Sequence, residues 1–151
     1  MAPKKARKFV FKITDVPFLE TPDGTMRDSF MITEETCGAQ MMTAGLVFVP
    51  PHSQNHEDIH EVEELFYIVK GKGKITYDGK PMDVEAGDMV FMPAHVAHRV
   101  INDSDKPYIA VWAILTKTSD LGEKLLGEMK TWKEIKPNTG WSKWPHMPKK
   151  K

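Results

Sequence analysis

The sequence predicts an all-β fold, either a β-sandwich or a closed barrel. Short runs rich in β-branched and aromatic residues recur through most of the chain, and glycine, proline and aspartate turn signals separate them at close, regular spacing. Only one segment has helical periodicity. With 151 residues, 40% of them hydrophobic, the chain is long enough for one domain with a substantial core.

About nine short strands are expected. The clearest is 65–69, because its five residues are all β-branched, aromatic or leucine and glycines follow it. Asp78-Gly79 is a strong signal for a two-residue turn between two strands. A loop is expected at 36–38. The expected strands are 8–13, 26–33, 39–49 (one or two strands bent at Gly45), 65–69, 72–77, 81–84, 89–92, 99–101 and 108–115.

The segment 119–130 is predicted to be a short C-terminal helix, since leucine, leucine and methionine recur in it every four residues. The chain after this helix contains Trp141 and Trp144 and is too apolar for a free tail, so we expect it to pack across the barrel or on a partner subunit. The expected organisation is a disordered basic tail (1–7), a barrel domain (8–118), a helix with a tryptophan-containing packing extension (119–148) and a second basic tail (149–151).

The net charge of zero hides an asymmetry. Seven of the 21 basic residues lie within 1–8 and 149–151, so the rest of the chain carries a net charge of about −7. No aromatic-basic platform accompanies these tails, and no nucleic-acid partner is expected. No apolar run is long enough to span a membrane. The single cysteine, Cys37, fits a cytoplasmic location.

The stretch 50–73 carries the clearest chemical signal. His56, Asp58, His60 and Glu64 are separated by even numbers of residues, and in extended chain such residues share one face. The segment can therefore direct several metal-ligand side chains toward one point. Imidazole and carboxylate groups that converge in this way form a site for a first-row transition metal.

A second cluster lies at 87–102, where Gly87, Pro93, His98 and Asn102 have the spacing of the second motif of the cupin superfamily, G-x5-P-x-G-x2-H-x3-N. His95 replaces the middle glycine. Together with the first stretch, this cluster makes residues 39–115 resemble a single-domain cupin of the metal-binding type. The resemblance implies a double-stranded β-helix, the cupin jelly-roll barrel.

The first cupin motif, G-x5-H-x-H-x3-4-E-x6-G, matches at His60, Glu64 and Gly71. Its opening glycine has no clear counterpart, and Asp58 occupies the place of the earlier histidine. The resemblance implies three histidines and a glutamate around a divalent metal, iron first and manganese, nickel, zinc or copper as alternatives. We expect the ligands to be His56, His60, Glu64 and His98, with Asp58 as the alternative to His56.

His95 lies in the turn of the second motif, and we expect it to act as an acid or base near the metal. A competing interpretation concerns residues 56–60, which read H-E-x-x-H, the signature of zinc proteases. That chemistry needs a helix, whereas prolines precede the segment and a β-rich run follows it, so a stable helix has too little room.

The resemblance implies a metal-dependent enzyme that acts on a small organic substrate, most simply an oxygenase or related oxidoreductase with a non-haem metal, dioxygenase-like. One alternative is a lyase, isomerase or decarboxylase that uses the metal as a Lewis acid. Another is a non-enzymatic cupin that binds or senses a small ligand. A homodimer is expected because many cupins are dimers.

Overall fold

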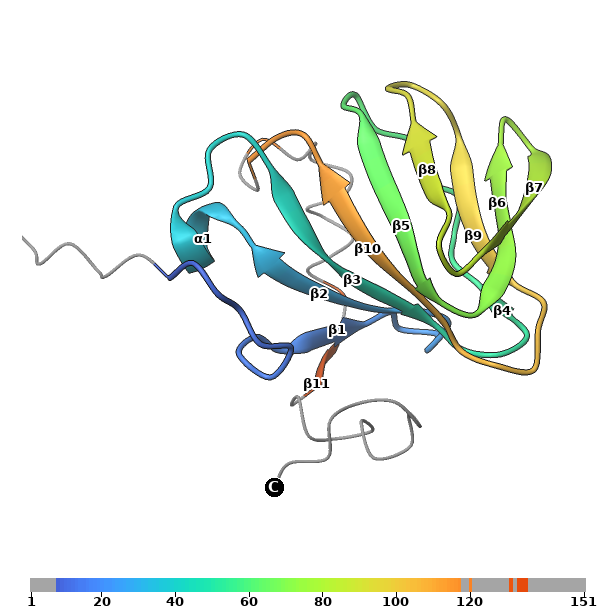
Figure 1. The fold of residues 1–151 in the computed structure, drawn as a ribbon, viewed down its shortest axis with the longest axis horizontal. Helices are drawn as coiled ribbons and strands as arrows, with labels where there is room; N and C mark the ends of the chain where they lie inside the picture. The colour runs from blue at the N-terminus through green and yellow to red at the C-terminus, as the bar shows by residue number, and fades with distance from the viewer. Residues whose placement is uncertain (1–7, 118–119, 121–130, 132, 136–151) are drawn as a thin grey trace, which may run out of the picture.

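The computed structural model describes residues 8–117, 120, 131 and 133–135, which contain eleven strands and one short helix (Figure 1). The elements are β1 Phe18–Glu20, β2 Arg27–Ile32, α1 Glu34–Cys37, β3 Thr43–Val49, β4 Ser53–Gln54, β5 Glu64–Lys70, β6 Lys72–Tyr77, β7 Lys80–Glu85, β8 Met89–Met92, β9 His98–Asn102, β10 Tyr108–Ile114 and β11 Lys133–Ile135.

The strands form two antiparallel sheets that face each other. The larger sheet has the order β11-β1-β2-β3-β10-β5-β8, and the smaller has the order β4-β9-β6-β7. In Figure 1 the two sheets diverge from a common end. The predicted all-β fold, a double-stranded β-helix, is confirmed.

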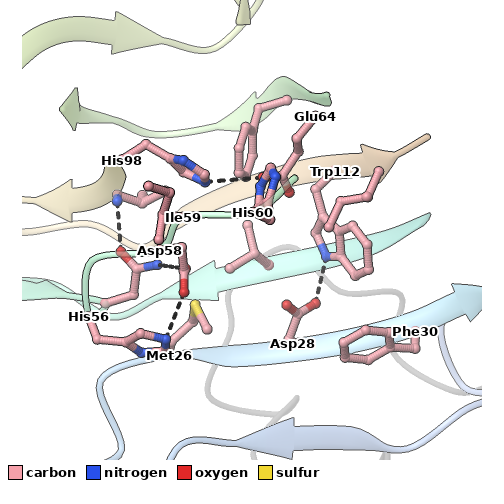
Figure 2. Close-up of a pocket in the computed structure, with 15 residues that line it drawn as sticks. Met26, Asp28, Phe30, His56, Asp58, Ile59, His60, Glu64, His98 and Trp112 are labelled. Carbon is pink, nitrogen blue, oxygen red and sulfur yellow. Dashed lines mark hydrogen bonds and ion pairs between the residues drawn. The ribbon is translucent and has the colours of Figure 1, made fainter. Parts of the chain in front are cut away.

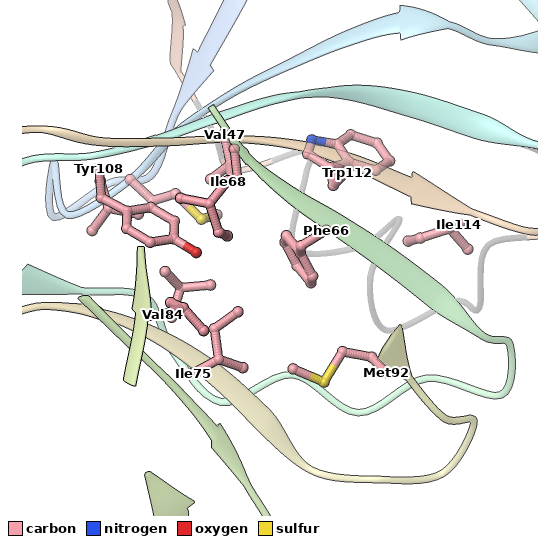
Figure 3. Packing of buried hydrophobic residues seen from close by; sticks show 13 residues of the cluster. Val47, Phe66, Ile68, Ile75, Val84, Met92, Tyr108, Trp112 and Ile114 are labelled. Atoms are coloured by element: carbon pink, nitrogen blue, oxygen red, sulfur yellow. The ribbon is translucent and has the colours of Figure 1, made fainter. Parts of the chain in front are cut away.

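The core fills the space between the sheets. Along β5, Glu64, Phe66 and Ile68 are buried while the residues between them are exposed, so every second side chain of this strand points inward. Figure 3 shows Phe66 and Ile68 in the same cluster as Ile75 and Val84 of the smaller sheet. The cluster contains Val47, Val49, Phe66, Ile68, Ile75, Val84, Met92, Val100, Tyr108, Ala110, Trp112 and Ile114.

Asn102, at the end of β9, holds the connection from β9 to β10 in place. Its side chain is fully buried, and its Nδ2 atom donates to the carbonyl oxygens of Val49, Pro50 and Lys106 at 3.0, 3.0 and 2.8 Å. Its Oδ1 atom accepts from the backbone N–H and the hydroxyl of Ser104. One amide group therefore satisfies backbone groups from two separate segments.

The hairpin between β6 and β7 turns at Asp78-Gly79, as predicted. Both residues have positive φ angles, 48° and 75°, which is the geometry of a type I′ turn. Of the segment predicted at 39–49, residues 43–49 form one continuous strand, β3, which runs through Gly45. This glycine instead permits close strand packing, since a Cβ atom there would lie 1.6 Å from the carbonyl oxygen of Ser29 on β2.

Two local predictions are wrong. Residues 8–13 form no strand, and Phe9 and Val10 are largely exposed, because no strand among the described residues supplies the backbone partners that an alternating pattern needs. The loop expected at 36–38 is largely occupied by the helical turn α1. Thr33 and Thr36 form a reciprocal capping box that stabilises this turn, and Gly38 ends it in the left-handed conformation.

The predicted helix at 119–130 and the tryptophan-containing extension fall almost entirely outside the described residues, as do both basic tails. Their predicted structures stay predictions. Of the extension, the described part includes β11, which pairs with β1 in antiparallel register. The described chain contains no helix with the length and apolar character needed to cross a membrane.

We predict that Asn102→Ala lowers the free energy of unfolding by about 2–4 kcal/mol, because it removes a group that satisfies buried backbone carbonyls. Ser104→Ala, which removes one partner of the same network, should cost about 1 kcal/mol or less. Urea denaturation measures both. Equal losses in the two variants would contradict the role assigned to Asn102.

Candidate metal centre

Three side chains converge at one end of the barrel interior. His60, Glu64 and His98 each offer a ligand atom, and these atoms all lie within 4.8 Å of one another. The Nε2 atoms of His60 and His98 lie 2.9 and 3.2 Å from the same oxygen, Oε2 of Glu64. The two imidazole rings meet edge to face, with their centroids 4.8 Å apart. Figure 2 shows the three side chains pointing toward one another.

The strands and two backbone carbonyls set this geometry. Glu64 and His98 are the first residues of β5 and β9, and both are buried at inward-facing positions. The Nδ1 atom of His60 donates to the Val62 carbonyl at 2.6 Å, and that of His98 donates to the Val96 carbonyl at 3.0 Å. Because a carbonyl only accepts, the Nδ1 atoms carry protons, and the Nε2 lone pairs of neutral rings face Glu64.

A proton or a metal cation is needed where these groups meet. Two imidazole lone pairs and a carboxylate oxygen are all acceptors, and they approach to hydrogen-bond distance in a largely buried place. Burial lowers the pKa of His98, but the hydrogen bonds to Glu64 and to the Val96 carbonyl, together with the charges of Glu64 and Asp58, raise it more, so the net shift is upward. The site thus attracts positive charge, and the donor set of two imidazoles and one carboxylate fits a first-row metal ion.

A cavity of about 70 Å³ opens beside the cluster. This is roughly half the volume of an apolar cavity that holds benzene, about 150 Å³, so it suits a small molecule or one end of a larger one. Its walls are mainly apolar and come from both sheets. They include Met26, Phe30, Val47, Phe66, Val100, Trp112 and Ile114.

His56 and Asp58 line the same cavity near its mouth. The Nε2 atom of His56 lies 2.8 Å from Oδ1 of Asp58, and Asn55 Nδ2 donates to the other carboxylate oxygen at 3.1 Å. Asn55 is itself held by a 2.7 Å bond from the Val100 N–H to its Oδ1 atom. Sequence analysis assigned His56 to the ligand set, whereas the structure groups the other three ligands and pairs His56 with Asp58. The assignment of His56 stays a prediction.

His95 lies apart from the cavity-lining residues. It is exposed in the turn before β9 with a φ of 64°, and its backbone N–H donates to the His60 carbonyl at 2.8 Å. The His95 side chain is not among the described residues that line the cavity, and its acid–base role stays a prediction. Residues 56–60 are not helical, which removes the geometry that a zinc protease requires.

Asp28 is a cavity residue that the sequence analysis did not identify. It lies on β2, is buried, and its Oδ1 atom accepts a 2.6 Å hydrogen bond from the indole N–H of Trp112. Burial raises the pKa of Asp28 well above its ordinary value, and the charges of Glu64 and Asp58 add to this effect, whereas the Trp112 bond opposes it. One signal was available, since Asp28 alternates with apolar Met26 and Phe30.

Comparison with known proteins agrees with this fold. Residues 45–114 match the family model described as the cupin domain. A predicted oxalate decarboxylase from Thermotoga maritima superposes with a TM-score of 0.63 at 21% identity, over 72% of this chain and 99% of that one. Residues 45–114 of the chain form a cupin domain.

A second solved cupin shares the fold at lower identity. An RmlC-like cupin from Shewanella frigidimarina superposes with a TM-score of 0.59 at 18% identity, over 80% of this chain and 98% of that one. Among curated proteins, a glucose-6-phosphate isomerase of Thermococcus litoralis is 39% identical over 51 residues, which make up 30% of this chain and 27% of the isomerase. An uncharacterized protein of Methanocaldococcus jannaschii is 33% identical over 45 residues, 30% of this chain and 36% of that protein. This cupin thus covers about a third or less of the curated relatives that it matches.

We predict that the purified cupin binds about one transition-metal ion per chain and that Glu64→Gln and His98→Ala each lower the affinity at least tenfold. Elemental analysis and metal titration measure this. His95→Ala is the matched control, because it removes an exposed imidazole from the turn just before His98. The same titration on His56→Ala and Asp58→Ala decides which of them serves as a fourth ligand. Full metal content in both Glu64→Gln and His98→Ala would refute the site.

Proposed function

We propose that this cupin is a metal-dependent enzyme that acts on a small organic substrate. The observation that supports this most directly is the convergence of His60, Glu64 and His98 at the wall of a small, mainly apolar cavity. Three protein ligands leave coordination positions open to a substrate, whereas a purely structural metal site is closed by its protein ligands.

A metal held there would supply Lewis acidity or redox chemistry to a bound substrate. The chain's own residues have separate tasks. The Val62 and Val96 carbonyls fix the orientation of the two imidazoles. Apolar side chains such as Phe66 and Ile114 exclude water from the cavity, and electrostatic interactions with the substrate are stronger in such a place.

Among reaction classes we place an oxygenase or related oxidoreductase first. Two histidines and one carboxylate are the ligand set typical of non-haem iron oxygenases, in which open positions accept substrate and oxygen. Iron is therefore our first choice of metal, and manganese, nickel, zinc and copper are the alternatives.

A second candidate is an isomerase, decarboxylase or lyase that uses the metal only as a Lewis acid. Two similarities favour it. A curated glucose-6-phosphate isomerase is 39% identical to this chain over 51 residues. One structural neighbour is named a predicted oxalate decarboxylase. These names describe those proteins, and the shared segment or fold transfers no substrate by itself.

We also propose that the cupin forms a homodimer through the outer face of β5 and β8. Leu65, Tyr67 and Val69 on β5 and Met89 and Phe91 on β8 are exposed there, and the pairs Leu65–Phe91 and Tyr67–Met89 are direct neighbours across the strands. The strand β8 is also the edge of its sheet, so two copies related by a two-fold axis can bury the same apolar face twice.

For the dimer, light scattering should give twice the mass of one chain for the wild-type protein. Tyr67→Glu should shift the mass toward that of a single chain, because a buried unpaired charge opposes association. Asp83→Ala, on β7 of the other sheet, is the matched control and should leave the mass unchanged. A wild-type protein with the mass of one chain would contradict the proposal.

For the reaction class, the reconstituted iron protein is incubated with a panel of small hydroxy acids, keto acids, phenols and sugar phosphates while dissolved oxygen is recorded. An oxygenase consumes oxygen together with one substrate, and Glu64→Gln should lower this rate at least a hundredfold, about 3 kcal/mol. Substrate conversion without oxygen uptake would support the Lewis-acid class. Binding of a panel compound without any conversion would support a sensing cupin.

A further inference from the structure

Asp28 faces the cavity from β2, away from the three-residue cluster (Figure 2). Its residue is only 8% exposed, and within the described part of the chain no lysine, arginine or histidine forms an ion pair with it. Its side chain accepts the 2.6 Å hydrogen bond from Trp112 and a backbone hydrogen bond from Ser29. Phe30 packs edge to face against the same indole at a centroid distance of 5.0 Å, which fixes the donor.

A structural role does not require an acid at this position. An asparagine would accept the hydrogen bond from Trp112 equally well and would bring no charge into an apolar wall. An ionised carboxylate placed there without a cation costs free energy, and the costs of burial favour its neutral form. Both a neutral carboxyl group and an amide can donate a hydrogen bond, but only the carboxyl O–H can release a proton.

We propose that Asp28 is the proton donor of the cavity and hydrogen-bonds one oxygen of a substrate whose other oxygen function occupies the metal site. The substrate class is then a small compound with oxygen functions on two neighbouring or nearby carbons, such as a hydroxy acid, keto acid or dicarboxylic acid. This inference rests on the proposed function, because it takes the Glu64 cluster as the other end of the substrate site.

The charges that face Asp28 support a neutral form near pH 7. The cavity carries the carboxylates Glu64, on β5, and Asp58, in the loop before it, together with His56, His60 and His98. Burial is the largest cause that raises the pKa of Asp28, and the negative charges of Glu64 and Asp58 raise this pKa further. A metal ion held by His60, Glu64 and His98 would offset part of the effect of the Glu64 charge on the pKa of Asp28. It would leave the effect of burial on this pKa unchanged.

The proton step is simple to balance. The O–H bond of Asp28 breaks and a new O–H bond forms on a substrate oxygen that is gaining negative charge. The electron pair stays on the Asp28 carboxylate, which the Trp112 N–H then stabilises. Solvent returns a proton to Asp28 when the product leaves through the mouth lined by His56 and Ile59, both of which are partly exposed.

The first test uses the whole metal-free chain with ¹⁵N-labelled tryptophan. The indole N–H signal of Trp112, identified by its loss in Trp112→Phe, should move with pH in a single step well above the ordinary range of an aspartate. This step should be absent in Asp28→Asn, which keeps the hydrogen bond but cannot titrate. A step within the ordinary range of an aspartate, or an equal step in Asp28→Asn, would overturn the proposal.

The second test measures malonate and acetate binding to the zinc-loaded chain by calorimetry. Malonate has a second carboxylate for Asp28, whereas acetate has only the one that the metal takes. Wild-type affinity for malonate should fall as the pH rises through the Asp28 titration, because the donor proton is lost. Asp28→Asn should remove this dependence, and Asp28→Leu should weaken malonate about tenfold, the worth of one hydrogen bond, with acetate unchanged.

Equal loss of malonate and acetate in Asp28→Leu, or malonate binding that keeps its pH dependence in Asp28→Asn, would overturn the role of Asp28 while leaving the metal site intact. Failure of the proposed function has a different signature: the wild-type chain would bind neither zinc nor acetate. The indole titration needs no metal, so it still decides whether Asp28 is neutral near pH 7.

Discussion

The hydrogen bonds from the two imidazole Nδ1 atoms to the Val62 and Val96 carbonyls are the constraint on which the site depends. They fix which nitrogen of each ring carries the proton, and they therefore turn the two Nε2 lone pairs toward Glu64. Each bond spans only two residues in sequence, so the orientation is local and survives small movements of the sheets. The barrel then has one remaining task, which is to bring the starts of β5 and β9 together.

Sheet register accomplishes that task. Glu64 is paired with Met92 of β8 and Ile114 of β10, while His98 is paired with Tyr77 of β6 and, through an isolated bridge, with Asp58. A slip of one residue in either strand would turn the metal-ligating side chain outward. It would also move the buried apolar side chains of that strand to the exposed face of the sheet. The packing of residues such as Phe66 and Val100 therefore selects the register that also assembles the site.

The electrostatic character of the cavity follows from the same arrangement. Three carboxyl groups, those of Asp28, Asp58 and Glu64, line a small and mainly apolar space. They differ in their partners: Glu64 faces two imidazoles, Asp58 lies against His56 and Asn55, and Asp28 has the indole of Trp112. Groups of one chemical type thus acquire different preferred charges, which is how a single cavity can hold a cation at one place and a neutral acid at another.

Much of the fold and part of the site could be predicted from local pattern. Alternation and turn residues gave most strands, since burial on one face and turn conformation are local properties. The strand expected at 8–13 failed because pairing needs a partner that the pattern does not supply. His60, Glu64 and His98 were found because their motifs have fixed spacing, whereas Asp28 is 36 residues before Glu64 in the sequence and belongs to no motif.

By itself, the sequence determined the all-β architecture, the two motif strands and the residue types available to hold a metal. Only the tertiary structure decided which of these residues meet, since strands distant in sequence are brought together by sheet order and not by spacing. It paired His56 with Asp58, placed His95 in an exposed turn and brought Asp28 of β2 into the cavity beside Trp112 of β10. The physical reason is that periodicity specifies which face of a strand is buried, while the environment of a buried group depends on side chains from other strands.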